Sequence, residues 1–520
     1  MDESRTVGQG GTILRNVASN WAGFAVNAAV TLALTPFVLR TLGPSAYGIW
    51  ILSSSVIGYY GFLDLGFRAG VTQYLARYLA QGDGDRASDC MSTSVAALAT
   101  FGVFLAVLSG GVALALPHLF NVPADLLNDA IWCVLIVGIS SAIQFSLSPF
   151  TSVFAATQRF DLANAIGIST RLLGAAAIVA TLQGGYGLVG ISAVTCLTSI
   201  VDYAIRWRIS RRIAPGLEIS RRRISIARLR EISSFGAWNF FISLNAFVYQ
   251  HVPNILIGLF MPVAAVGRYA LSVGLNRQIN SVIGPIGQVI YPAAAAMDVR
   301  GDRRGLERLY HDGSRLMMLV TSCAVVLAFF WAEDFFRLWV GEEYIAGTEY
   351  PSVALIFQVL LLSTLTNFSN IGGQILMGAG RVKAVALIQV LGSVLNLGVS
   401  LALFGRFGLL GVAMAVVVAS LVVDLVAMPV LVERYLGLSV LRLVRNAYGR
   451  PLMSAVLQIV AATGIQAMGR VGGWSDLVLQ VGMASLASAF VVVVLGVTGD
   501  ERARFVTGPL RRVLRLGRSR

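Results

Sequence analysis

Polar side chains recur at helical spacing inside long apolar stretches of this chain. One series in residues 14–40 consists of Asn16, Asn20, Gly23, Asn27 and Thr31. A second series in residues 232–260 consists of Asn239, Ser243, Ala246, Gln250 and Asn254. Residues three or four apart share one face of a helix, so each series predicts a polar stripe. We expect both stripes to face a water-filled cavity, because a polar face turned toward lipid is costly.

Three further stretches carry polar stripes. The stripe in residues 127–154 is Ser141, Gln144, Ser148 and Ser152, and the stripe in residues 351–377 is Ser363, Asn367, Asn370 and Gln374. Both favour hydrogen bonds between helices. The stripe in residues 264–293 is Arg277, Asn280, Gly284 and Gln288. We expect Arg277 and Asn280 to lie at the same cavity as Asn20, Asn27, Gln250 and Asn254.

Arg277 lies in the middle of its apolar stretch, where a guanidinium needs an anion. Two sources of negative charge are open. A ligand is one, because the guanidinium fork binds a phosphate or pyrophosphate with two hydrogen bonds. A carboxylate of the protein is the other, and Asp202 and Asp424 lie in other apolar stretches.

No catalytic or metal-binding arrangement accompanies the stripes. The sequence has no glycine-rich phosphate loop, no His/Cys metal spacing and no nucleophile elbow. The four cysteines lie in or at the start of apolar stretches, so we expect buried thiols without disulfides. His251 is a candidate for proton coupling, with a packing role as the alternative. We expect no enzymatic activity, no cofactor and no metal.

The elements that must position these residues are membrane-spanning helices. Of 520 residues, 56% are hydrophobic and 13% are charged, and the mean hydropathy is +0.75; a soluble domain carries more surface charge. About 20 apolar residues span a bilayer as a helix. The first apolar run lacks a cleavage site and is expected to be retained. Fourteen spans are predicted, at 14–40, 45–66, 90–116, 127–154, 164–182, 188–206, 232–260, 264–293, 315–340, 351–377, 384–404, 409–431, 451–469 and 477–498.

Positive charge is concentrated in alternate loops, which explains the net charge of +14 without a nucleic-acid partner. Arg40, Arg337, Arg406 and Arg470 are assigned to the outer side, and Arg268 and Arg277 to the eighth span. The remaining basic residues are assigned to the cytoplasmic side, so both termini are predicted to be cytoplasmic. The densest basic segment, residues 206–231, is expected to contact anionic lipid headgroups; docking of a cytoplasmic partner is the alternative.

Short motifs recur about 220 residues apart. Gly82-Asp83 matches Gly301-Asp302, Arg159 matches Arg381, and the sequence from Gly187 to Gly190 matches that from Gly408 to Gly411. An even number of spans per repeat gives two repeats of like orientation. We therefore predict an N-lobe of six helices (residues 1–210), a basic cytoplasmic linker (211–231), a C-lobe of six helices (232–435), and two extra helices with a basic tail (436–520).

The sequence from Leu39 to Gly48, LRTLGPSAYG, resembles the turn that joins the first two helices of bacterial polysaccharide flippases. The segment from Gly61 to Phe67, GFLDLGF, followed by Arg77 and Gly82-Asp83, is similar to their second-helix signature. These flippases belong to the multidrug/oligosaccharidyl-lipid/polysaccharide exporter superfamily. The resemblance covers most of the chain in span number and order, with its specific motifs in residues 14–90.

The resemblance implies two six-helix lobes around a central cavity that opens to each side of the membrane in turn. It further implies transport of an undecaprenyl-pyrophosphate-linked oligosaccharide across the inner membrane for cell-surface polysaccharide biosynthesis, including lipopolysaccharide. Expected partners are this lipid-linked oligosaccharide, membrane lipids, and polysaccharide polymerase or assembly proteins.

Two other functions stay open. A drug or cation antiporter of the same superfamily usually carries a carboxylate in its first helix, whereas this first helix has asparagines and no acid. A non-transporting scaffold of a glycan assembly complex would leave the long polar stripes unexplained.

Overall fold

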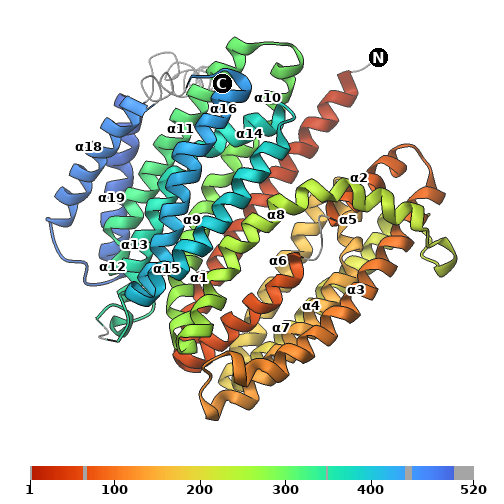
Figure 1. Ribbon diagram of the computed structural model, residues 1–520, viewed down its shortest axis with the longest axis horizontal. Coiled ribbons are helices and arrows are strands. Elements are labelled where there is room, and N and C mark those ends of the chain that lie inside the picture. Colours follow the sequence, from red (N-terminus) through yellow and green to blue (C-terminus); the bar gives the residue numbers. More distant parts are fainter. Residues whose placement is uncertain (1–2, 63–66, 347–348, 440–447, 497–520) are drawn as a thin grey trace, which may run out of the picture. The chain divides into compact units, whose positions relative to one another are not determined.

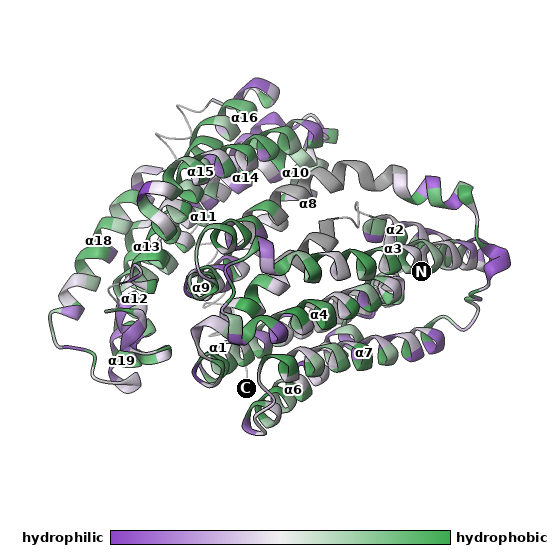
Figure 2. Cartoon of the chain, turned by 60° about the horizontal axis from the view of Figure 1, so that its bottom comes forward, coloured by the Kyte–Doolittle hydropathy of each residue, from purple (hydrophilic) through white to green (hydrophobic). Residues whose placement is uncertain are grey.

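The computed structural model describes residues 3–62, 67–346, 349–439 and 448–496. In these residues the chain is almost entirely helical, and the pairing of Asn121 with Pro262 is an isolated bridge. Hydrophilic residues gather mainly at helix ends and in loops (Figure 2). The described chain has ten helical segments long and apolar enough to cross a membrane. The prediction of an all-helical polytopic membrane protein is confirmed, and the count of about fourteen spans stays a prediction.

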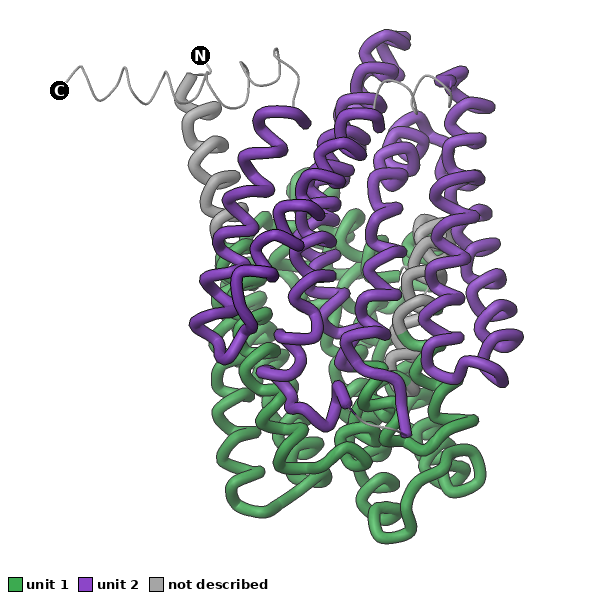
Figure 3. Tube along the Cα trace, turned by 90° about the vertical axis from the view of Figure 1, so that its left-hand side faces the viewer, with its two compact units in different colours: residues 1–270 green, residues 271–520 purple. Residues whose placement is uncertain are grey.

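Contacts divide the chain into two compact units, Met1–Ala270 and Leu271–Arg520 (Figure 3). This division differs from the two sequence repeats, whose predicted boundaries at residues 210 and 232 stay a prediction.

The helices of unit 1 (Figure 1) are α1 (Glu3–Phe62), α2 (Phe67–Ala80), α3 (Gly84–Leu119), α4 (Leu127–Leu147), α5 (Pro149–Ala156), α6 (Phe160–Gln183), α7 (Gly187–Ile213) and α8 (Ile226–Phe260), with short 3-10 turns η1 (Ala124–Leu126) and η2 (Arg221–Arg223). The helix α9 (Val263–Gln288) begins in unit 1 and continues into unit 2.

The helices of unit 2 are α10 (Ile290–Val299), α11 (Arg303–Phe330), α12 (Ala332–Trp339), α13 (Val353–Thr364), α14 (Asn370–Gly378), α15 (Val382–Ser420), α16 (Met428–Leu436), α18 (Gly449–Gln466) and α19 (Trp474–Val491). Between them lie 3-10 turns η3 (Glu342–Tyr344) and η4 (Leu365–Ser369), and π-helical segments η5 (Leu421–Ala427) and η7 (Val492–Gly496).

Two long helices each contain two predicted spans, joined at a glycine. The backbone of α1 leaves the helical conformation at Gly43, with φ of 79°, and that of α15 does so at Gly408, with φ of 53°. Glycine adopts positive φ without the steric cost of a side chain. These two positions fall between the spans predicted on either side of them.

The sequence repeat is matched by the local backbone. Gly82 and Gly301 have φ of 70° and 66°, and Gly187 and Gly408 have φ of 55° and 53°. The aspartate after each member of the first pair caps the following helix: Asp83 accepts from the backbone N–H of Arg86 at 3.0 Å, and Asp302 accepts from that of Gly305 at 2.8 Å. The matched motifs thus form similar local turns, and the arrangement of the two repeats stays a prediction.

Each unit has its own apolar core. In unit 1, side chains such as Val71, Leu75 and Leu105 pack between α2, α3 and α4. In unit 2, one cluster joins α11, α14 and α16, and another, which includes Trp331, packs α18 and α19 against α12 and the C-terminal end of α11.

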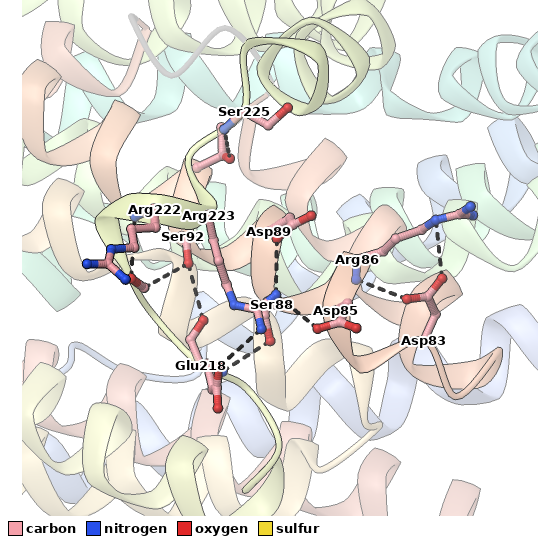
Figure 4. A network of polar contacts seen from close by, with 12 residues as sticks. Asp83, Asp85, Arg86, Ser88, Asp89, Ser92, Glu218, Arg222, Arg223 and Ser225 are labelled. Carbon is pink, nitrogen blue, oxygen red and sulfur yellow. Dashed lines mark hydrogen bonds and ion pairs between the residues drawn. The ribbon is translucent and has the colours of Figure 1, made fainter.

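The basic segment between α7 and α8 is fastened along α3 (Figure 4). Ser88 accepts from the backbone N–H of Glu218, Ser92 accepts from that of Ser220, and Thr93 accepts from that of Ser225, all at 3.0–3.1 Å. Because the three hydroxyls lie four and one residues apart on one helix, they hold the segment in one register.

Side-chain charge completes this attachment. Arg223 forms ion pairs with Asp85, Asp89 and Glu218 at 3.0–3.4 Å. These carboxylates raise the pKa of Arg223 above its ordinary value. Arg221 and Arg222 are exposed, so they are the members of this 3-10 turn that suit the predicted contact with anionic headgroups, which stays a prediction.

Candidate functional site

The polar stripe of α1 lies against α6. The Asn164 side-chain amide of α6 donates to the Asn20 Oδ1 at 2.6 Å and to the Ser19 Oγ at 3.1 Å. Asn20 and Asn27 are both exposed on α1. The side chain of Asn16 lies outside the described residues. Asn20 and Asn27 therefore share a polar face that α6 extends.

Arg171 adds a positive charge to this face. It is the twelfth of the 24 residues of α6, its side chain is exposed, and its Nη2 donates to the Thr31 Oγ1 of α1 at 3.1 Å. With the other basic residues, Arg171 was assigned to the cytoplasmic side. This assignment is wrong about depth, because Arg171 lies in the middle of α6 and not at its end. The signal was present, because Arg171 also lies in the middle of an apolar stretch, as Arg277 does.

The carboxylate of Asp202 is engaged within unit 1. Arg206 Nε donates to Asp202 Oδ2 at 2.6 Å and Arg206 Nη2 donates to Asp202 Oδ1 at 3.2 Å. Thr170 of α6 donates to the same carboxylate at 2.9 Å. This partly buried ion pair lies within α7 and accounts for the charge of Asp202. The bonds from Thr170 to Asp202 and from Arg206 to the Ala163 carbonyl join α7 to α6.

Arg277 is exposed on α9, the fifteenth of its 26 residues. Asp424, the other acid considered as its partner, has Thr366 Oγ1 as its side-chain hydrogen-bond partner instead. Within the described part of unit 2, Arg277 has no ion pair. Both carboxylates named as internal partners are thus bound elsewhere, which favours a ligand as the source of negative charge.

Asn280 belongs to a hydrogen-bonded group between α9 and the α13–η4 segment. Its amide donates to Thr364 Oγ1 at 3.2 Å, and it accepts from the Asn367 amide at 2.6 Å. Thr364 Oγ1 in turn donates to Asn276 Oδ1 at 2.9 Å. Asn367 therefore joins helices, as predicted for its stripe, and Asn280 is part of the same contact in this conformation.

Of the polar stripe on α8, the structure describes the side chain only of Asn254, at its C-terminal end. Asn254 is 6% exposed and donates to the Ser55 Oγ of α1 at 2.9 Å, so it also joins helices here. His251 is partly buried, and its predicted coupling role stays a prediction. The side chain of Gln250 lies outside the described residues.

The fold and these two polar faces define a multi-pass membrane transporter. The chain belongs to the polysaccharide biosynthesis protein family, whose model matches residues 37–349. This is the polysaccharide flippase family of the multidrug/oligosaccharidyl-lipid/polysaccharide exporter superfamily, as the sequence motifs predicted.

Two relatives match this chain over nearly all of their own length. The uncharacterized membrane protein EpsK of Bacillus subtilis is 20% identical over 94% of this chain and 96% of its own. A putative O-antigen transporter of Shigella flexneri is 20% identical over 78% of this chain and 94% of its own.

Solved structures share the fold. The lipid II flippase MurJ in an inward closed conformation aligns with a TM-score of 0.73 at 11% identity, over 93% of this chain and 98% of its own. An inward-facing multidrug transporter of the MATE family aligns with a TM-score of 0.66 at 15% identity, over 78% of this chain and 94% of its own. At these identities the likeness concerns the fold alone.

Proposed function

We propose that this protein is a flippase that moves an undecaprenyl-pyrophosphate-linked oligosaccharide across the inner membrane by alternating access, for the synthesis of cell-surface polysaccharide. The observation that carries the proposal is a mid-helix arginine exposed in each unit, Arg171 on α6 and Arg277 on α9. A polar or charged side chain at this depth is tolerated where it lines a water-filled space.

The neighbours of these arginines suit a sugar joined to a diphosphate. Asn27 lies one turn from Thr31, the partner of Arg171, and Asn20 and Asn164 are bonded to each other farther along the same two helices. Amides both donate to and accept from sugar hydroxyls. A guanidinium binds a phosphate with two hydrogen bonds. The name of the Shigella flexneri relative, a putative O-antigen transporter, agrees with such a substrate.

The same charge disfavours a drug or cation antiporter. The described polar face of α1 carries no acid and gains a cation from Arg171. Like charges repel, so this face would oppose a cationic drug.

The test is transport of a fluorescent undecaprenyl-pyrophosphate oligosaccharide in proteoliposomes. Arg171→Ala and Arg277→Ala should each weaken substrate binding about 10- to 100-fold, because a hydrogen bond to a charged group contributes about 1.5–3 kcal/mol. Lysine at either position should recover part of the loss, since charge remains without the guanidinium fork.

Arg406→Ala is the matched control, because Arg406 is exposed near the predicted outer end of its span, beside Phe407. Normal transport by folded Arg171→Ala and Arg277→Ala proteins would overturn the proposed role of both arginines. A wild-type protein that moves no such lipid would overturn the substrate.

A further inference from the structure

Asp424 lies near the middle of the part that follows the turn at Gly408 in the apolar helical run from Val382 to Leu436. It belongs to the π-helical segment η5, which packs against the 3-10 turn η4 between α13 and α14. Two irregular turns thus meet at one carboxylate. π-Helical turns within α-helices are frequent at functional sites, and a carboxylate inside a membrane span is costly unless it has a role.

The hydrogen bonds around Asp424 involve two hydroxyls of η4. Ser369 Oγ donates to the backbone carbonyl of Asp424. Thr366 Oγ1 lies 2.5 Å from Asp424 Oδ2 and 2.8 Å from the backbone carbonyl of Ser363. Thr366 is 3% exposed, so water does not replace either contact.

The number of hydrogens decides which atoms donate. A threonine hydroxyl has one hydrogen, and a backbone carbonyl has none to give. Each contact has a hydrogen of its own when the carboxyl of Asp424 is protonated, because Thr366 then donates to the Ser363 carbonyl and Asp424 donates to Thr366. When Asp424 is charged, the one Thr366 hydrogen is drawn to the carboxylate at the expense of the Ser363 carbonyl, or is shared between the two. The pair of contacts therefore favours the protonated carboxyl.

Among the described residues, no cation forms an ion pair with the carboxylate of Asp424. The helix α9 bonds η4 through Asn280 and carries Arg277 three positions away, and no ion pair joins Arg277 to Asp424. The segment η4 has no titratable residue. On α15 and α16 the titratable residues are Lys383, Arg406, Glu433, Arg434 and Tyr435, which are nine or more positions from Asp424, about 13 Å along a helix. The helix α11 also packs on η4. Its titratable residue nearest to this site is Tyr310, which lies against Gly372, one to two helical turns beyond Thr366.

Asp202 is the natural comparison. It is also a mid-span acid, but Arg206 gives it an ion pair at 2.6 Å. One acid is balanced by a cation, whereas the other is balanced by a proton.

We propose that Asp424 is the proton-binding site of unit 2 and that its proton couples transport to the pH gradient. When Asp424 loses the proton, the Thr366 hydrogen is drawn to the carboxylate at the expense of the Ser363 carbonyl, which changes the junction between α13 and α14. Proton binding thereby favours one arrangement of two helices. The coupling part of this inference rests on the proposed function, and the protonation part does not.

The first experiment measures protonation alone, on purified full-length protein in lipid nanodiscs at neutral pH. Infrared absorption of a protonated carboxyl should be present in the wild type, lost in Asp424→Asn and kept in Asp202→Asn. An Asp424→Asn spectrum that matches the wild type in this region would overturn the proposal.

The second experiment measures coupling in proteoliposomes that carry a fluorescent undecaprenyl-pyrophosphate oligosaccharide. A gradient of one pH unit should shift the leaflet distribution up to about tenfold for one proton per cycle. Asp424→Asn should keep downhill movement and lose this shift. If the shift persists while the infrared band is lost, Asp424 is a neutral structural residue and the coupling is wrong.

Thr366→Val keeps the test decisive if Asp424→Asn does not fold. Removing the hydroxyl should shift the infrared frequency of the Asp424 carboxyl to that of a carboxyl without this hydrogen-bond partner. An unchanged frequency would contradict the assigned contact. If the wild type moves no lipid while the band behaves as expected, the proposed function fails and the protonation of Asp424 stands.

Discussion

Arg206 and Arg277 are both arginines of apolar helices, but we expect opposite results when each is replaced by alanine. Arg206 is 12% exposed and is bound to Asp202, whose side chain is 17% exposed. Arg206→Ala leaves that carboxylate with Thr170 as its hydrogen-bond donor. Breaking a buried ion pair by removing one partner costs about 3–5 kcal/mol. The low exposure of both side chains means that little of this cost is relieved by solvent.

Arg277 has no ion pair in the described part of unit 2, and its side chain is exposed. Arg277→Ala should therefore change the free energy of unfolding by no more than about 0.5 kcal/mol, as at other exposed positions. Its effect should be on transport.

The assay is equilibrium unfolding of the purified variants in detergent, monitored by circular dichroism. A double-mutant cycle of Asp202→Ala and Arg206→Ala should give a coupling energy of about 2–3 kcal/mol. Replacing the pair by Asp202→Leu and Arg206→Met should restore most of the stability, because apolar residues of similar volume leave no buried charge. Asp312→Ala is the control, since its pair with Arg315 is 57% exposed on the acid side and should contribute less than about 1 kcal/mol.

Two outcomes would refute this reasoning. A coupling energy near zero would mean that the Arg206–Asp202 pair within α7 does not stabilise the protein. A loss of 3 kcal/mol or more in Arg277→Ala would mean that Arg277 is paired within the protein, and it would remove the main support for a ligand anion.

Two predictions concern the basic segment of unit 1 between α7 and α8 and the start of α8. Ser92→Ala removes one hydrogen bond to the Glu218 carbonyl and one from the Ser220 N–H, so trypsin should cleave faster at Arg221 and Arg222. Ser94→Ala is the control: the Ser94 hydroxyl donates to a carbonyl of its own helix, so its loss should not change the cleavage rate. Burial alone would raise the pKa of the Glu231 carboxyl, but hydrogen bonds from Arg228 and Tyr78 outweigh burial and lower it. A lowered pKa means that the folded state favours the charged form. Glu231→Gln should therefore destabilise the protein at neutral pH, and the difference in thermal stability should vanish as the pH falls below the usual range of glutamate; a difference that persists in acid would contradict this.

The sequence by itself determined the class of protein. Apolar runs of membrane length dictate helices, because a bilayer offers backbone groups no other hydrogen-bond partners. The glycines at positions 43 and 408 marked the turns between spans, since positive φ is a local requirement. The matched motifs around Gly82 and Gly301 were also local, and each proved to be a glycine turn with an aspartate cap.

Only the tertiary structure decided which partner each polar side chain has. Asn254 and Asn280 lie in polar stripes like those of Asn20 and Asn27, yet the first two are buried or partly buried in contacts between helices. Asn20 and Asn27 are exposed, although Asn20 also accepts from Asn164 of α6. The helical period gives the face of a residue but not the element opposite it. For the same reason, the assignment of Arg171 to Thr31 and of Asp424 to Thr366 depended on packing between segments that the sequence pattern does not relate. The pair of Asp202 with Arg206 is different, because the two residues are four positions apart on one helix, a spacing that the sequence itself shows.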